Sequence, residues 1–309
     1  MHKDTRIYIT GHTGMVGTRL LKYFQENKYK NIITTSHSQL DLRNQKKVDL
    51  FLKKEKPEII VHLAAKVGGI ASNIKYPAEY IYDNLMMQTN IIHSAYKYNC
   101  EKLLFMGSSC IYPRETPQPM KEEYLMTGKL EPTNKSYAVA KIAGIQMCQA
   151  YDIEYNTNFI SLIPCNLYGP RDHYGDMNSH VMAALIDRFH KAKITQKQKV
   201  IVWGSGKPRR EFLFVDDLVS AILFLLKCYD DPEIINVGTG YDISIRNLAT
   251  KISNIIGYSG KIEFDPTKPD GMMKKLLDVS KIEKLGWKAK TDLDEGIKMS
   301  YQYYLKRYE

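Results

Sequence analysis

The sequence predicts an α/β protein, built on a doubly wound parallel sheet with helices on both faces and extended by a smaller α/β domain. Two observations predict this fold. Through the first half of the chain, short apolar segments of strand length alternate with longer amphipathic segments of helix length, an alternation that is typical of βαβ units. In addition, a glycine-rich segment directly follows the first of these strands, which is where such sheets bind phosphate groups.

Each element follows from its own stretch of the chain. Short apolar runs predict strands at residues 6–10, 31–35, 59–63, 103–106 and 158–163. Amphipathic segments predict helices at residues 15–25, 77–99 and 135–155, and residues 50–56 fit the end of a further helix. From about residue 166 the alternation of strands and helices becomes less regular, because glycine and proline interrupt it. Residues 211–229 resemble another strand and helix.

The length and composition are those of an ordinary globular protein. The 309 residues are 44% hydrophobic and 25% charged, which excludes a disordered or fibrous chain. The formal net charge of +10 suggests an anionic partner, which could be nucleic acid, an acidic membrane surface or a phosphorylated small molecule. The lysines are scattered rather than massed with aromatic residues, so we expect no nucleic-acid partner.

The cysteines and the apolar segments indicate the compartment. A strand at residues 6–10 leaves no room for a secretory signal before it, and the longest apolar stretch, residues 219–226, is far shorter than the ~20 residues of a membrane span. The five cysteines are odd in number and include no CxxC pair, which argues against a disulfide framework and against a zinc site. We therefore expect a cytoplasmic, soluble protein with no metal and no membrane contact.

The glycine-rich segment places Gly11, Gly14 and Gly17 at intervals of three residues between a strand and a helix. The first glycine allows a tight turn, the second a close approach to a pyrophosphate, and the third close packing of helix on strand. The free N–H groups at the start of the helix would face the diphosphate. This spacing favours the short-chain dehydrogenase/reductase version of the Rossmann-type dinucleotide site.

These observations divide the chain. We assign residues 1–165 to a dinucleotide-binding Rossmann domain and residues 166–309 to an interleaved substrate-binding domain. About residues 196–228 are expected to return to the first domain.

The residues after the second strand bear on the choice of cofactor. Residues 34–38 read Thr-Thr-Ser-His-Ser and contain no acid. An acid at this point would bind the ribose hydroxyls of NAD and repel a 2′-phosphate, whereas hydroxyl groups and His37 tolerate the phosphate. The sequence therefore favours NADPH, with NADH possible. Asp41 is a candidate contact for the adenine edge, or else a helix cap.

Tyr137 and Lys141 stand four residues apart, on one face of a predicted helix. In a catalytic site the lysine charge is expected to lower the pKa of the phenol, which can then protonate a forming alkoxide. Ser108 follows the preceding strand, at the edge where α/β sheets present their chemistry, and can bind the carbonyl being reduced. The three residues predict a reductase. Taken alone, a Tyr-x-x-x-Lys match is also common on ordinary surfaces.

The sequence resembles the GDP-L-fucose synthase family of extended short-chain reductases, from residue 6 nearly to the C-terminus. The motifs that carry the resemblance stand in family order at residues 107–113, 131–134, 137–141, 166–170, 178–181, 203–206, 210–213 and 275–278. The most specific are Ser-Ser-Cys-Ile-Tyr-Pro at 108–113 and Asn-Ser-His-Val at 178–181.

The resemblance implies reduction at C4 of GDP-4-keto-6-deoxy-mannose, coupled to epimerisation at C3 and C5. It makes Cys110 the base and His180 the acid of the epimerisation, whereas the reduction by Ser108, Tyr137 and Lys141 also rests on the residues themselves. Relatives that act on GDP-4-keto-heptoses or that only reduce could keep both epimerisation residues.

The resemblance also implies the binding residues. The residues expected at the cofactor are Gly11, Thr13, Gly14, Met15, Val16, Gly17, Ser36, His37, Asp41, Leu42, Leu63, Ala64, Ala65, Tyr137, Lys141, Pro164, Asn166, Leu167 and His180. Residues 67–69 would line the far side of the cofactor. The residues expected at the substrate are Ser108, Ser109, Cys110, Asn166, Val181, Arg188, Trp203, Arg210, Lys275 and Asp278. The chain departs from the family at Thr13 and His37, where NADPH-dependent members carry arginine, and this weakens the expected discrimination against NADH.

Two other classes stay open at this point. One is a nucleotide-sugar epimerase or dehydratase that recycles bound NAD, although a dehydratase would need an acidic pair where Ser109 and Cys110 stand. The other is a binding protein with a reductase-like fold, although such relatives usually lose the Tyr137 or Lys141 equivalent. The resemblance further implies a homodimer formed through the helices at 77–99 and 135–155.

Overall fold

The computed structural model describes residues 1–175, 179–268 and 270–308. A six-stranded parallel sheet forms its centre, in the order β2-β1-β3-β4-β5-β9. The strands are β1 (Ile7–Thr10), β2 (Ile32–Ile33), β3 (Ile59–His62), β4 (Lys102–Met106), β5 (Phe159–Pro164) and β9 (Ile235–Val237). The predicted doubly wound parallel sheet is confirmed. The chain passes from β1 to β2 on one side and then to β3 on the other, so the strand order reverses between β1 and β3.

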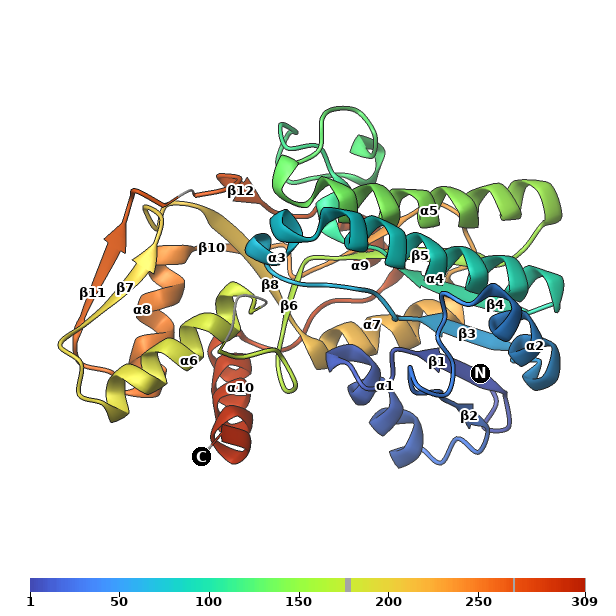
Figure 1. The fold of residues 1–309 in the computed structure, drawn as a ribbon, viewed down its shortest axis with the longest axis horizontal. Helices are drawn as coiled ribbons and strands as arrows, with labels where there is room; N and C mark the ends of the chain where they lie inside the picture. The colour runs from blue at the N-terminus through green and yellow to red at the C-terminus, as the bar shows by residue number, and fades with distance from the viewer. Residues whose placement is uncertain (176–178, 269, 309) are drawn as a thin grey trace.

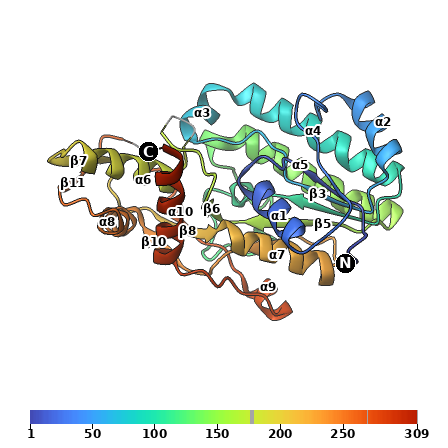
Figure 2. The same ribbon diagram turned by 90° about the horizontal axis from the view of Figure 1, so that it is seen from below.

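Helices cover both faces of this sheet. Figure 1 shows α4 and α5 above the sheet and α1 and α7 below it, and Figure 2 shows the same layers from another side. The bounds are α1 (Met15–Glu26), α2 (Gln45–Glu55), α3 (Ile70–Lys75), α4 (Pro77–Lys97), α5 (Lys135–Tyr155) and α7 (Val215–Cys228). Because both faces are covered, β1, β3, β4 and β5 are buried along their whole length, which explains why they are near-continuous apolar runs.

A second layer lies beyond the carboxyl ends of the sheet and has a hydrophobic core of its own. Its strands are β6 (Asn166–Tyr168), β7 (Lys199–Trp203), β8 (Arg209–Phe214), β10 (Asp242–Ser244), β11 (Lys261–Asp265) and β12 (Lys274–Lys275). Its helices are α6 (Val181–Ile194), α8 (Ile245–Ile256) and α10 (Leu293–Tyr308), whereas α9 (Ser280–Leu285) packs beside β9 at the edge of the first sheet. Short 3₁₀ turns occur at Ser109–Ile111, Glu122–Tyr124 and Pro132–Asn134.

Most predicted elements lie within a few residues of the observed ones, and the helix at 135–155 has the predicted bounds. The strand predicted at 31–35 is only Ile32–Ile33. The strand β9 was not predicted, because three residues show no period that distinguishes a strand. The segment 196–228 divides: β7 pairs with β11 in the second layer, whereas α7 packs on α1. The division of the chain into two domains stays a prediction.

Among the residues that the structure describes, no helix combines the length and the apolar character that crossing a membrane requires.

Candidate active site

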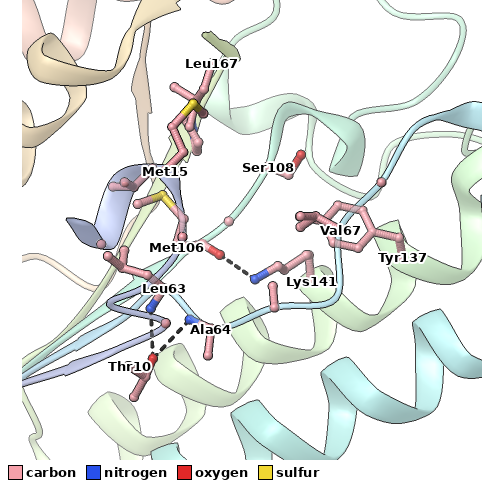
Figure 3. A pocket seen from close by; sticks show the side chains of 18 of the residues that line it. Thr10, Met15, Leu63, Ala64, Val67, Met106, Ser108, Tyr137, Lys141 and Leu167 are labelled. Carbon is pink, nitrogen blue, oxygen red and sulfur yellow. Dashed lines mark hydrogen bonds between the residues drawn. The ribbon is translucent and has the colours of Figure 1, made fainter. Parts of the chain in front are cut away.

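A cavity of about 610 Å³ opens at the carboxyl edge of the six-stranded sheet. Its walls come from the β1–α1 loop, the ends of β3, β4 and β5, the start of α6 and the strand β12. Figure 3 shows part of this wall from close by. The cavity therefore lies where the strand order reverses between β1 and β3, which is the usual ligand site of an open α/β sheet.

The glycine loop forms one wall of the cavity and has the geometry of a phosphate cradle. Gly11 has φ +69°, and a Cβ there would lie 2.8 Å from the backbone nitrogen of Ala64. A Cβ on Gly17 would lie 2.3 Å from the carbonyl oxygen of Gly11, so both positions require glycine. Gly14, which has no side chain, immediately precedes α1, and the first N–H groups of that helix are therefore open to an anion. These features fit a dinucleotide diphosphate.

Thr10 ties the glycine loop to the loop after β3. Its Oγ1 accepts the backbone N–H groups of Leu63 and Ala64, each at 3.0 Å (Figure 3). The same oxygen lies 3.0 Å from Nδ1 of His62, which is fully buried. Since the hydroxyl accepts twice, its own proton goes to His62 Nδ1. Burial, and then the charge of Lys141, lower the pKa of His62 to about 3, so the ring is neutral.

Ser108, Tyr137 and Lys141, the residues expected to carry out the reduction, lie together in the cavity wall. The Lys141 ammonium is buried, donates to the carbonyl oxygen of Met106 at 2.8 Å (Figure 3) and lies 6.0 Å from the centroid of the Tyr137 ring. Burial lowers the pKa of Lys141 to about 7. The expected lowering of the Tyr137 pKa is wrong for this structure: burial and the neighbouring Cys110 raise the pKa, and the Ser108 hydroxyl offsets this only in part.

Cys110 lies in the 3₁₀ turn after β4, with hydrogen-bond donors around its sulfur. Nδ2 of Asn134 lies 3.1 Å and Nζ of Lys275 lies 3.3 Å from Sγ. Burial alone would raise the pKa of this thiol, but the charge of Lys275, the Ser108 hydroxyl and the charge of Arg210 together lower it. The structure thus favours the thiolate, the reactive form of cysteine.

His180 lines the same cavity and immediately precedes α6. Burial, followed by the charges of His173 and Lys275, lowers the pKa of its imidazole. Asn178, which belongs to the same predicted motif, lies outside the described residues.

The structure brings together all the predicted cofactor residues except Asp41, and Val67 and Gly68 join them in the cavity wall. The side chain of Asp41 is held instead by Arg43, whose hydrogen bonds, against some desolvation, lower the pKa of the carboxyl group to about 2. It lies 3.9 Å from Nδ1 of His37. Its role at the adenine edge stays a prediction.

The predicted substrate residues divide into two groups. Ser108, Ser109, Cys110, Asn166, Val181 and Lys275 line the cavity, whereas Arg188, Trp203, Arg210 and Asp278 do not. Arg210 is nevertheless close enough to Cys110 for its charge to act on the thiol. The indole of Trp203 is 65% exposed, and Asp278 accepts the backbone N–H of Ser280 at the start of α9. These positions show why a motif alone does not place a side chain.

Arg188 lies in a second cavity of about 460 Å³ between α6 and β7, where it donates to the carbonyl oxygen of Ile201 at 2.6 Å. Lys191, Lys197 and Lys199 also line this second cavity. Asp187 lines it as well and pairs with Lys191 at 2.8 Å.

Several positions that line the main cavity were not predicted from the sequence. The unpredicted lining residues are Tyr8, Thr10, His12, Thr35, Leu40, Asn73, Met87, Met106, Gly107, Asn134, Cys165, Met182 and Phe212.

Glu211 is a buried carboxylate that the sequence did not single out. It is fully buried and accepts backbone N–H groups from Thr239, Gly240 and Leu277. Burial raises the pKa of Glu211 to about 7, against the effect of these three hydrogen bonds. Among the described residues, no group of three or more His, Cys, Asp or Glu side chains could hold a metal ion.

Comparisons with known proteins agree with this geometry. Residues 7–238 match the model of the NAD dependent epimerase/dehydratase family. The chain is 49% identical over 304 residues to GDP-L-fucose synthase 1 of Arabidopsis thaliana, covering 98% of this chain and 94% of the relative.

Two solved structures from Campylobacter jejuni are also similar, and each match covers 99% of both chains. One is a GDP-6-OMe-4-keto-L-xylo-heptose reductase, with 39% identity and a TM-score of 0.94. The other is a GDP-mannoheptose C4 reductase with NADP bound, with 41% identity and a TM-score of 0.91.

Proposed function

The chain belongs to the GDP-L-fucose synthase family, within the NAD-dependent epimerases and dehydratases, and from this membership we propose an NADPH-dependent C4 reductase that also epimerises C3 and C5. The substrate is a GDP-4-keto-6-deoxy-hexose or a GDP-4-keto-heptose. The observation that carries the proposal is that Cys110, Ser108, Tyr137 and Lys141 all line the same cavity.

The glycine loop and the buried Lys141 hold the cofactor in this scheme. The free N–H groups at the start of α1 bind the diphosphate. Among the described residues, the Lys141 ammonium donates only to the carbonyl oxygen of Met106, which leaves donors for the nicotinamide ribose. Bound NADPH supplies the hydride for C4 of the sugar. Thr13 and His37 at the adenine end carry less positive charge than arginine, which suits NADPH without strict exclusion of NADH.

Tyr137 and Ser108 serve the reduction. The raised pKa of Tyr137 keeps its phenol protonated at neutral pH, and this is the form that donates a proton to the C4 oxygen as the ketone becomes an alcohol. The Ser108 hydroxyl binds the same oxygen and orients the ketone toward the cofactor. Tyr137 then regains its proton from solvent.

Cys110 and His180 serve the epimerisation. A ketone at C4 makes the hydrogens at C3 and C5 acidic, so a thiolate can remove either proton and leave an enolate whose charge lies on the C4 oxygen. The lowered pKa of Cys110 favours that thiolate. Burial lowers the pKa of His180, but the negative charge of the enolate favours a protonated imidazole beside it, and His180 then returns a proton to the opposite face of the carbon. Both residues exchange protons with solvent before the second carbon reacts.

The relatives support two substrate classes. The identity to the plant GDP-L-fucose synthase favours a 6-deoxy-hexose, whereas the two bacterial structures are named for heptose substrates. A second candidate function is therefore reduction of a GDP-4-keto-heptose without epimerisation. This second function would use Ser108, Tyr137 and Lys141 in the same way, but Cys110 and His180 would take no part in the reaction.

The test measures NADPH oxidation with GDP-4-keto-6-deoxy-mannose and with GDP-4-keto-heptoses, and determines the stereochemistry of each product. Inversion at C3 and C5 that is lost in Cys110→Ser supports the full proposal. Reduction without inversion, unchanged in Cys110→Ser, leaves the reductase alone. No oxidation with any GDP-4-keto sugar rejects both functions, and tightly bound NAD that is recycled during turnover would indicate an epimerase or dehydratase.

A cytoplasmic homodimer formed through α4 and α5 completes the proposal. The two helices lie side by side on the outer face of the sheet (Figure 1). Tyr82 on α4 is 59% exposed and Ile153 on α5 is 84% exposed, which suits a face that another copy covers. Sedimentation equilibrium should give twice the chain mass of 35.6 kDa. A monomer at micromolar concentration would exclude the dimer.

A further inference from the structure

Asn134 joins the two halves of the site. It ends the 3₁₀ turn Pro132–Asn134 and directly precedes α5. It stands three residues before Tyr137 and seven before Lys141, so all three lie on one side of the helix. All three also line the main cavity. Asn134 is thus placed beside the residues of the reduction while its amide contacts the residue of the epimerisation.

The contact is a hydrogen bond to sulfur. Nδ2 of Asn134 lies 3.1 Å from Sγ of Cys110, closer than Nζ of Lys275 at 3.3 Å. An N–H donor stabilises a thiolate more than a thiol, because the charged acceptor forms the stronger hydrogen bond. The Asn134 amide donates at every pH and, being uncharged, is not attracted to a phosphate. The Lys275 ammonium comes from β12 in the second layer and can also bind the substrate diphosphate.

We propose that Asn134 is a positioning residue that holds the Cys110 thiolate as the base for the protons at C3 and C5 of the sugar. The inference rests on the proposed function, because it gives that thiolate its task. When the substrate diphosphate draws Lys275 away, Asn134 remains as the donor that fixes the direction of the sulfur.

The amide oxygen of Asn134 indicates that this side chain lies beside the sugar. Oδ1 of Asn134 is buried and has no hydrogen-bond partner among the described residues. A buried carbonyl oxygen is normally hydrogen-bonded, and a sugar hydroxyl supplies the missing donor. The backbone of the turn is secured separately, since Glu131 Oε1 accepts from the N–H and the hydroxyl of Thr133. Truncating the Asn134 side chain therefore leaves the contacts that shape the turn.

The first test needs no substrate. It follows alkylation of Cys110 by iodoacetamide against pH, by peptide mass spectrometry, in protein where the exposed Cys228 is replaced by serine. Asn134→Ala should raise the apparent pKa of Cys110 by about one unit and slow alkylation about tenfold near neutral pH. The limiting rate at high pH should be unchanged, because access to the sulfur is unchanged. Asn134→Asp should raise the apparent pKa further, through its negative charge, and serves as the test if the alanine variant does not fold.

The matched control is Asn73→Ala. Asn73 also lines the cavity, but its amide donates to the carbonyl oxygens of Gly68 and Gly69 and not to the thiol. Its alkylation profile should match that of the parent protein. A parent-like profile in the folded Asn134 variants would overturn the proposal, as would an equal shift in the control.

The second test uses turnover. In D₂O, Asn134→Ala should slow deuterium incorporation at C3 and C5 about tenfold more than it slows NADPH oxidation with the epimerised substrate, because only proton removal needs the thiolate. Equal losses in both rates would contradict a role confined to the base. If no GDP-4-keto sugar reacts but the alkylation profile still shifts, the proposed function fails while the effect of Asn134 on the thiol stands. The two failures are therefore distinguishable.

Discussion

Lys275 and Cys110 are 165 positions apart in the chain, yet the lysine Nζ lies 3.3 Å from the cysteine Sγ. The cysteine belongs to the turn after β4 in the first layer, and the lysine to β12 in the second. A charge from one layer therefore sets the protonation of a thiol in the other. The second layer therefore contributes to the low pKa of the proposed base.

Tyr137→Phe removes the phenol proton and keeps the ring. NADPH oxidation with the substrate should fall about 10²–10⁴-fold, the range for loss of a general acid. Cofactor affinity, measured by fluorescence titration, should change little because the residue acts on the sugar oxygen. A variant that kept more than a tenth of the parent rate would show that another group donates the proton.

Lys141→Met should change how stability depends on pH. Burial depresses the folded-state pKa of Lys141 to about 7, well below the unfolded value of about 10.4. Between these values the unfolded chain holds one more proton, so this lysine makes the free energy of unfolding rise by about 1.4 kcal/mol per pH unit. In the variant, the free energy of unfolding measured by urea denaturation between pH 7 and pH 10 should lack this rise. Identical slopes in the two proteins would mean that Lys141 stays charged in the fold.

His37→Arg should increase the preference for NADPH. His37 lines the cavity at the adenine end and lies 3.9 Å from Asp41. A charge-assisted bond from arginine to the 2′-phosphate contributes about 1.5–3 kcal/mol, so the ratio of kcat/KM for NADPH over NADH should rise about tenfold or more. Ser38→Arg is the control, because it adds the same charge at a position that does not line the cavity. A similar rise in both variants would indicate a general effect of charge.

Glu211→Ala should destabilise the fold strongly. Three backbone N–H groups would lose their acceptor, that of Leu277, which is buried, and those of Thr239 and Gly240, which are partly buried. An unpaired buried group costs about 1–3 kcal/mol. Glu122→Ala is the matched comparison, because Glu122 accepts a single such group, the N–H of Asn236. Because the three bonds should contribute roughly additively, the loss in free energy of unfolding should be about two to three times larger for Glu211→Ala than for Glu122→Ala. Chemical denaturation measures both losses. Equal losses would mean that the three bonds do not act through the carboxylate.

The sequence was most informative where structure is local. The helix at 135–155 and the glycine loop were predicted because helix periodicity and tight turns depend on neighbouring residues. The strand β9 and the pairing of β12 with β8 were missed, because short strands are defined by partners far away in the chain.

The same limit applies to the candidate site. Ser108, Tyr137 and Lys141 could be placed because they follow a strand or share a helix face. The contact between Asn134 and Cys110 could not, because it depends on how the 3₁₀ turn before α5 folds against the turn after β4. The position of Trp203 was equally unreadable, since nothing in its motif distinguishes an exposed indole from one in the cavity.

The position of β9 constrains how the protein is made. The chain completes β5 at Pro164, builds β6, α6, β7 and β8 of the second layer, and only then supplies α7 and the edge strand Ile235–Val237. A nascent chain that has emerged only as far as β5 therefore exposes an unpaired sheet edge and the apolar face that α7 later covers. Unpaired edges of this kind are prone to aggregation. Synthesis must pass residue 237 before the cofactor sheet can close, so a shorter fragment is expected to need chaperone protection on the ribosome.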